Sequence, residues 1–237
     1  MLQQIHDSFV ENFVETGKSS PPRHLGRRYD AAGNFLRERG NTIICRVVEA
    51  SASAATIAGV REGLKALPFA ERFAFTPVSS LHMTVFQGIV ESRRCLEYWP
   101  AGMPLDMAVD DTTRLFVDRL AGFPPVRPFR MRVTSVTPLG LTLAGAAPDD
   151  ERIVRWLRDE MAALLGYSHP DHFSYGFHIT LAYIKRWLPA GAEEAYLPRL
   201  AELRRQFGET DDVVELDPPA LCTFEDMTEF RPVVVLG

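Results

Sequence analysis

The sequence contains the same five-residue pattern twice, and this repeat constrains the fold more than any other feature. Residues 81–85 and 177–181 both read apolar, His, apolar, Thr, apolar, with the histidines at His82 and His178. Roughly 0.03 such pentapeptides are expected by chance in a chain of this composition. Because side chains alternate between the two faces of a β-strand, each His shares a face with the following Thr. We therefore predict two strands, each buried on its apolar face, that together line one groove.

Two imidazoles and two hydroxyls in one groove suit acid–base chemistry at a phosphodiester. Histidines with ordinary pKa values near 6.5 can exist as one neutral base and one charged acid around pH 6–7. One imidazole would take a proton from water or a hydroxyl, and the other would protonate the departing oxygen. Thr84 and Thr180 would donate hydrogen bonds to the phosphate oxygens as charge builds. This chemistry needs no metal or other cofactor. The alternative is that each His and Thr simply fills a half-buried strand.

Composition excludes several classes of function. The 237-residue chain has 24% charged residues and no apolar run of the length that a membrane span needs. Its first residues show no basic segment followed by an apolar stretch, as a secretory signal would. The net charge of −5 argues against a surface that follows long nucleic acid. We expect a cytoplasmic, soluble monomer without a membrane partner, acting on a small nucleotide or the phosphate of an RNA end.

Three cysteines, at positions 45, 95 and 222, are too few and too scattered for a disulfide framework or a thiolate zinc site. We expect them to be small buried residues.

Periodicity and turn residues predict strands and helices in an alternating order. Residues 1–40 form an extension, with a helix over 2–16 and a short hairpin over 29–36 around a Gly-Asn turn. Further helices are expected over 54–67, 106–120, 151–165 and 192–207. Strands are expected over 41–48, 80–89, 129–136, 141–143, 175–184, 213–217, 220–225 and 230–236. The order repeats, so we predict one internally duplicated α/β (α+β) domain over 41–237, with halves of about 41–125 and 126–237. Its sheets should be mixed or antiparallel, with helices on the outer faces, because tight turns cannot join parallel strands.

The segments His82-Met83-Thr84 and His178-Ile179-Thr180 resemble the paired H-x-T signatures of the two-histidine (2H) phosphoesterase superfamily. This superfamily includes RNA 2′,3′-cyclic phosphodiesterases and the 2′-5′ RNA ligase-like proteins. The resemblance extends over about residues 41–237 and implies a bilobal, pseudo-symmetric fold with both histidines and both threonines as the catalytic quartet. The segment before residue 41 is not part of that pattern, which suggests a less characterised bacterial branch whose substrate does not transfer from the better-known members.

Four further residues near the motifs are candidates for substrate binding. Phe86 should share the face of His82 and could stack on a base, or contact the other lobe instead. Tyr175 falls on the opposite face in a regular strand, where it would be a core or rim aromatic, unless a bulge at Gly176 turns it into the groove. Arg130 and Arg132 alternate with apolar residues and could hold a phosphate, although such alternation is typical of a solvated sheet face.

Two other functions fit the same sequence. His169, Asp171 and His172 could bind zinc in a metallohydrolase, although their spacing matches no standard ligand pattern. A non-catalytic module could instead hold a nucleotide or RNA-end phosphate in the same groove without turnover. Loss of activity on His-to-Ala substitution with retained ligand affinity would separate an enzyme from such a module.

Overall fold

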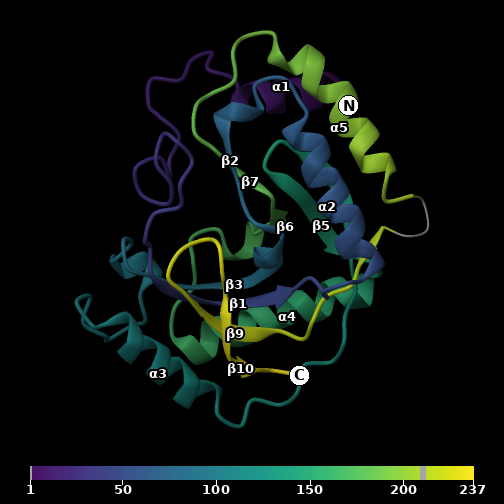
Figure 1. The fold of residues 1–237 in the computed structure, drawn as a ribbon. Helices are drawn as coiled ribbons and strands as arrows, with labels where there is room; N and C mark the ends of the chain where they lie inside the picture. The colour runs from purple at the N-terminus through teal and green to yellow at the C-terminus, as the bar shows by residue number, and fades with distance from the viewer. Residues whose placement is uncertain (1, 209–211) are drawn as a thin grey trace.

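A computed structural model describes residues 2–208 and 212–237, and in it one large sheet carries helices on its outer side (Figure 1). The α-helices are α1 (Leu2–Phe13), α2 (Ala52–Lys65), α3 (Val109–Leu120), α4 (Pro148–Leu165) and α5 (Ala192–Arg205). The strands are β1 (Gly40–Arg46), β2 (Phe73–Phe75), β3 (His82–Val90), β4 (Met131–Thr137), β5 (Gly140–Gly145), β6 (Phe177–Thr180), β7 (Ala182–Ile184), β8 (Val213–Val214), β9 (Ala220–Phe224) and β10 (Arg231–Val235). None of the helices in these ranges is both long and apolar enough to cross a membrane.

The large sheet brings the two repeated segments into its centre. Its strand order is β10-β9-β1-β3-β6-β5-β4-β8, and each neighbouring pair is antiparallel. The segment around His82 forms β3 and the segment around His178 forms β6, so the two predicted strands are direct neighbours. The predicted α+β fold with antiparallel pairing is confirmed.

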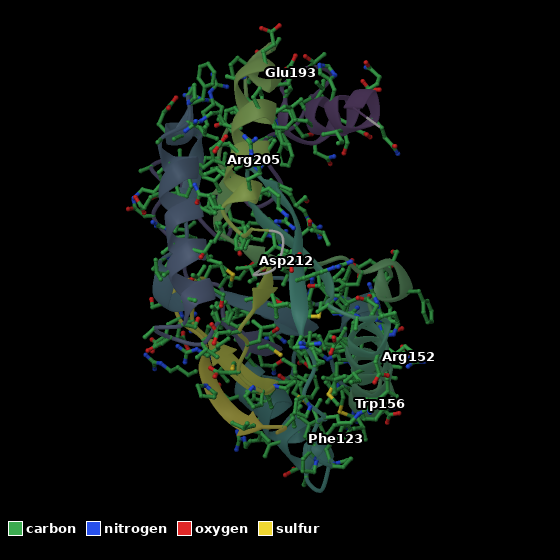
Figure 2. All side chains as sticks on the ribbon, turned by 90° about the vertical axis from the view of Figure 1, so that its right-hand side faces the viewer. Phe123, Arg152, Trp156, Glu193, Arg205 and Asp212 are labelled. Carbon is green, nitrogen blue, oxygen red and sulfur yellow. The ribbon has the colours of Figure 1, made fainter. Side chains whose placement is uncertain are left out.

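Helices from the two halves of the sequence pack together on the outer side of the sheet. Helix α4 lies against β3 and β5 and contacts α3, while α2 contacts α5. Figure 2 shows Arg152 and Trp156 of α4 directed away from the sheet, with Phe123 beside Trp156. The buried apolar side chains of β3 and β6, including Met83, Val85, Phe177 and Ile179, join the same core as these helices. Burial of this face leaves the opposite face of both strands for the groove.

The chain after Thr180 differs from the expected continuous strand. The expected strand over 175–184 is divided into β6 and β7, and β7 pairs with β2 in a separate two-stranded sheet. The backbone N–H groups of Leu181 and Ala182 both donate to Leu139, which turns the chain away from the large sheet. The strand β2 was not predicted, because three residues are too few to show an alternating pattern.

Residues 14–39 wrap around the edge of the groove rather than forming regular elements. Helix α1 ends at Phe13 instead of residue 16, and Val14 forms a bridge with Leu188. The Tyr29 hydroxyl donates to the carbonyl of Ile184 at 2.7 Å, and its ring stacks on Tyr183. Tyr29 is 1% exposed, so this segment is firmly attached to the sheet.

Candidate active site

The register between β3 and β6 sets the geometry of the site. Met83 pairs with Ile179 across the two antiparallel strands. Extending this register by one residue on each side puts His82 opposite Thr180 and Thr84 opposite His178. Residues directly opposite in an antiparallel pair have Cα atoms about 4.5–5.5 Å apart. The two copies of the motif therefore meet head to tail, and each histidine faces the threonine of the other copy.

All four side chains of this quartet, His82, Thr84, His178 and Thr180, line one groove. The groove has a volume of about 520 Å³. Its floor is the uncovered face of β3, β6 and β5, and its apolar side includes Phe224, Met227 and Phe230 from β9 and the loop that follows it. This groove is large enough for a nucleotide-sized ligand.

Both histidines are held by the same local hydrogen bond. His82 Nδ1 lies 2.7 Å from the carbonyl oxygen of Ser80, and His178 Nδ1 lies 2.9 Å from that of Gly176. A carbonyl oxygen only accepts, so Nδ1 carries the proton in each ring. Nε2 is thus the nitrogen that each ring offers to the groove. A neutral ring accepts a proton there and a charged ring donates one.

The surroundings of the two imidazoles differ. The pKa of His82 is lowered to about 4, chiefly by burial and to a smaller extent by the charges of His178 and Arg46, while the hydrogen bond to the Ser80 carbonyl opposes this shift. The ring of Phe230 covers His82 with ring centroids 4.1 Å apart. Because burial disfavours the charged form, His82 is neutral at physiological pH.

Tyr175 lines the groove, although alternation placed it on the opposite face. It precedes the first residue of β6, so the alternation of that strand does not apply to it. Its hydroxyl is buried without a hydrogen-bond partner among the described residues, with Thr84 and Gln87 beside it. The guanidinium of Arg158 lies 4.0 Å from its ring centroid. Burial raises the pKa of Tyr175 to about 12, so it offers the groove a neutral hydroxyl.

The prediction that Phe86 lies on the groove face is wrong. In the β1–β3 ladder Ile44 pairs with Thr84 but Ile43 pairs with Phe86, so Val85 is an extra residue on β3. This bulge shifts the alternation by one position. Phe86 is consequently buried in the core at 1% exposure, and Gln87 takes its place in the groove.

Arg130 and Arg132 do not line the groove. Strand β5 lies between β4 and β6, which separates both arginines from His178. The side chain of Arg130 is 70% exposed and its guanidinium is 4.0 Å from Asp150, while Arg132 is exposed at the surface of the sheet. The interpretation of their alternation as a solvated face was therefore the right one.

The side chains named for the zinc alternative are not arranged as a metal-binding cluster. No three His, Cys, Asp or Glu side chains of residues 2–208 and 212–237 are arranged to hold a metal ion. His169 packs edge-on against Tyr98 at 4.9 Å, and His172 Nε2 contacts Asp159 Oδ1 at 2.8 Å instead of joining His169 and Asp171. Both histidines are buried and pack near Phe86 in the core. Of the cysteines, Cys45 and Cys222 are buried as expected, but Cys95 is exposed.

Several groove residues were missed by sequence reasoning. His24 and Arg28 come from the segment treated as an extension, Arg93 follows β3, and Phe230 comes from the loop before β10. The only signal for them in the sequence was the group of basic residues over 23–28 in an acidic chain. Nothing local indicated that this group reaches the histidines.

Comparisons with known proteins found one family model and a similar solved structure. A family model described as "2H-phosphodiest: Domain of unknown function (DUF1868)" matches residues 28–142, which include the first motif and Arg28. A crystal structure of a conserved protein of unknown function from Agrobacterium tumefaciens is similar over nearly the whole chain. The identity is 44% and the TM-score 0.92, with 94% of this chain and 97% of that chain covered. No curated protein matches the sequence.

Proposed function

The chain belongs to the 2H phosphodiesterase family described as a domain of unknown function, and from this premise we propose that it is a phosphoesterase that opens a cyclic phosphate or cleaves a 2′-linked phosphodiester. The proposed substrate is a small nucleotide or an RNA end. One observation carries the proposal: each motif histidine is fixed at Nδ1 by the carbonyl two residues before it, so that both rings present Nε2 to one groove. This is the arrangement that paired acid–base catalysis requires.

The two environments suggest different roles for the histidines. His82, with its lowered pKa, is neutral and would accept a proton from the attacking water at Nε2. The water oxygen forms a bond to phosphorus while the bond from phosphorus to the ribose oxygen breaks. His178 would give its Nε2 proton to that departing oxygen. The hydroxyls of Thr84 and Thr180 would donate hydrogen bonds to the non-bridging oxygens, where negative charge builds.

A turnover screen tests this function. Adenosine 2′,3′-cyclic phosphate, ADP-ribose 1″,2″-cyclic phosphate and a 2′-5′-linked diadenosine are incubated with the protein, and products are followed by phosphorus NMR. We expect at least one of them to be hydrolysed, with full activity in excess EDTA because the proposed acid and base are both side chains. Activity abolished by chelation and restored by zinc would contradict the proposal.

His82→Ala and His178→Ala should each lower kcat by about 10²- to 10⁴-fold, the usual contribution of a positioned acid or base. The double variant should be little worse than either single variant, because the two residues act as one unit. His6→Ala, an exposed histidine on α1, is the matched control and should leave kcat unchanged. Near-normal turnover by both single variants would overturn the proposal. Retained ligand affinity without turnover in the wild-type protein would favour the non-catalytic binding module.

A further inference from the structure

The groove continues beyond the quartet to a group of basic side chains. His24 and Arg28, from the segment before β1, and Arg93, from the loop after β3, line the same groove as His82 and His178. Arg23 and Arg27 do not line the groove but lie near His24 and lower its pKa, and Arg27 also donates to Ser92. We call these five residues the basic end of the groove. Their charge is local, because the whole chain carries a net charge of −5.

Little negative charge balances the basic end. Arg28 Nε lies 2.6 Å from Oε2 of Glu38, a carboxylate that is 5% exposed. Arg93 has no carboxylate within salt-bridge distance among the described residues, and its buried Nε has no hydrogen-bond partner there. Its guanidinium instead lies 4.1 Å from the ring centroid of Tyr98 and donates from Nη1 to Oε1 of Gln87 at 3.3 Å. A buried guanidinium donor without an acceptor is costly unless a ligand supplies one.

The charged arginines at the basic end act on one another and keep His24 neutral. Burial lowers the pKa of Arg93, and the charge of Arg28 lowers it further. Burial and the charges of Arg28 and Arg23 lower the pKa of His24 to about 4. An anion bound between these side chains would relieve this repulsion. Guanidinium groups suit phosphate in particular, because their planar forks donate paired hydrogen bonds to its oxygens.

The position along β3 relates the basic end to the catalytic centre. Gln87, which contacts Arg93, follows Thr84 by three residues on the same groove-facing side of the strand. At about 3.3 Å per residue, this places Gln87 on the order of 10 Å from Thr84 along the strand. The spacing between the quartet and the basic end therefore matches that of two phosphates at opposite ends of one nucleotide.

We propose that the basic end binds a second phosphate, so that the substrate is a nucleotide carrying a separate phosphate in addition to the phosphodiester that is cleaved. This inference rests on the proposed function for the chemistry at the quartet, but its binding site is separate. If the basic end binds a phosphate, a nucleotide with two separated phosphates binds more tightly than a nucleotide with one.

Isothermal titration with adenosine 2′-monophosphate and adenosine 2′,5′-bisphosphate tests the inference directly. The wild-type protein should bind the bisphosphate about 10- to 100-fold more tightly, the effect expected of charge-assisted hydrogen bonds to one phosphate. Raising the salt concentration should reduce the difference. Equal affinities of the wild-type protein for the two ligands would overturn the inference.

Arg93→Gln should remove most of the preference for the bisphosphate. Arg93→Lys should keep part of this preference, because lysine keeps the positive charge but lacks the paired N–H donors of the guanidinium. Arg27→Gln, at an exposed position, should reduce the preference without disturbing the packing on Tyr98. Arg152→Gln is the matched control, since Arg152 lies on the outer side of α4 with its side chain 77% exposed (Figure 2). Thermal melting of each variant establishes that it is folded. A preference unchanged in Arg93→Gln and in Arg27→Gln would refute the assignment.

Failure of the two proposals can be told apart. A preference for the bisphosphate that persists in His178→Ala, together with wild-type turnover, supports both. A preference without turnover of any substrate rejects the catalytic proposal alone. Turnover with equal affinities for the two ligands rejects only the second phosphate site.

Discussion

At the scale of single residues, the two motif histidines share the same local hydrogen bond but differ in what packs against their rings. His82 and His178 share the same Nδ1 hydrogen bond to the carbonyl two residues before. Phe230 covers only the first ring closely, and burial lowers the pKa of His82 to about 4. A base with this pKa is already neutral well below pH 6. Activity limited by His82 should therefore persist further into acid than the ordinary histidine value predicts.

Phe230→Ala should raise the pKa of His82 towards its ordinary value of about 6.5, because water would reach the ring and favour its charged form. Since His82 must be neutral to accept a proton, the acid limb of kcat/KM should move to higher pH. Titration of the His82 ring by NMR and the pH profile measure the two effects. Phe123→Ala removes a ring that stacks on Trp156 on the outer side and should shift neither. An unmoved titration in Phe230→Ala would reject burial as the cause.

At the scale of elements, close approaches between strands hold the two motifs in register. The bulge at Val85 moves Phe86 into the core and Gln87 into the groove. On the other side of β6 from β3, Gly140 of β5 pairs with Thr180 of β6. Gly140 has φ of +143°, and a Cβ there would lie 2.1 Å from the carbonyl oxygen of Ile179. Only glycine allows β5 to approach β6 in this way.

Gly140→Ala should destabilise the protein by at least about 1–3 kcal/mol, the usual cost of overpacking, because the backbone of β6 must move. The same movement should displace Thr180 and reduce kcat. Urea unfolding and steady-state kinetics measure both effects. Gly59→Ala, inside α2 with nothing closer than 3.8 Å to its Cβ, is the control and should be neutral or stabilising. Wild-type stability of Gly140→Ala would contradict the close packing of β5 on β6.

At the scale of the whole molecule, folding places several histidines where they resist protonation. Burial is the main cause of a pKa lowered to about 4 in His24, His82 and His169. In the unfolded chain the same groups have the ordinary value near 6.5. Unfolding between about pH 4 and 6.5 is therefore accompanied by proton uptake. As the pH falls, the unfolded state becomes more stable relative to the folded state. The stability from keeping these rings neutral is complete above pH 6.5 and decreases towards pH 4.

The free energy of unfolding should thus decrease as the pH falls from about 6.5 to 4, with up to three protons taken up by these histidines. Urea titrations across this range measure the slope. His169→Gln removes one of the groups and should make the slope shallower. Phe123→Ala, which removes no titratable group, is the control and should leave the slope unchanged. If the slope is the same in His169→Gln as in the wild-type protein, the His169 ring does not contribute to the pH dependence of the free energy of unfolding.

The sequence by itself determined the helices and the pair of motif strands. The period of the apolar residues located the α-helices of residues 2–208 within a few residues of their bounds, and alternation placed His82 with Thr84 and His178 with Thr180 on the faces that line the groove. Both signals are local, because each depends only on which side chains a regular helix or strand buries.

Only the tertiary structure decided which other residues complete the groove. The bulge that exchanges Phe86 for Gln87 depends on pairing with β1, and the turn that brings in Tyr175 lies outside the regular part of β6. Arg28 and Arg93 enter the groove through contacts with Glu38, Gln87 and Tyr98, which no periodicity in the sequence records. Alternation is a property of one strand, whereas register and burial are properties of the strands and loops packed against it.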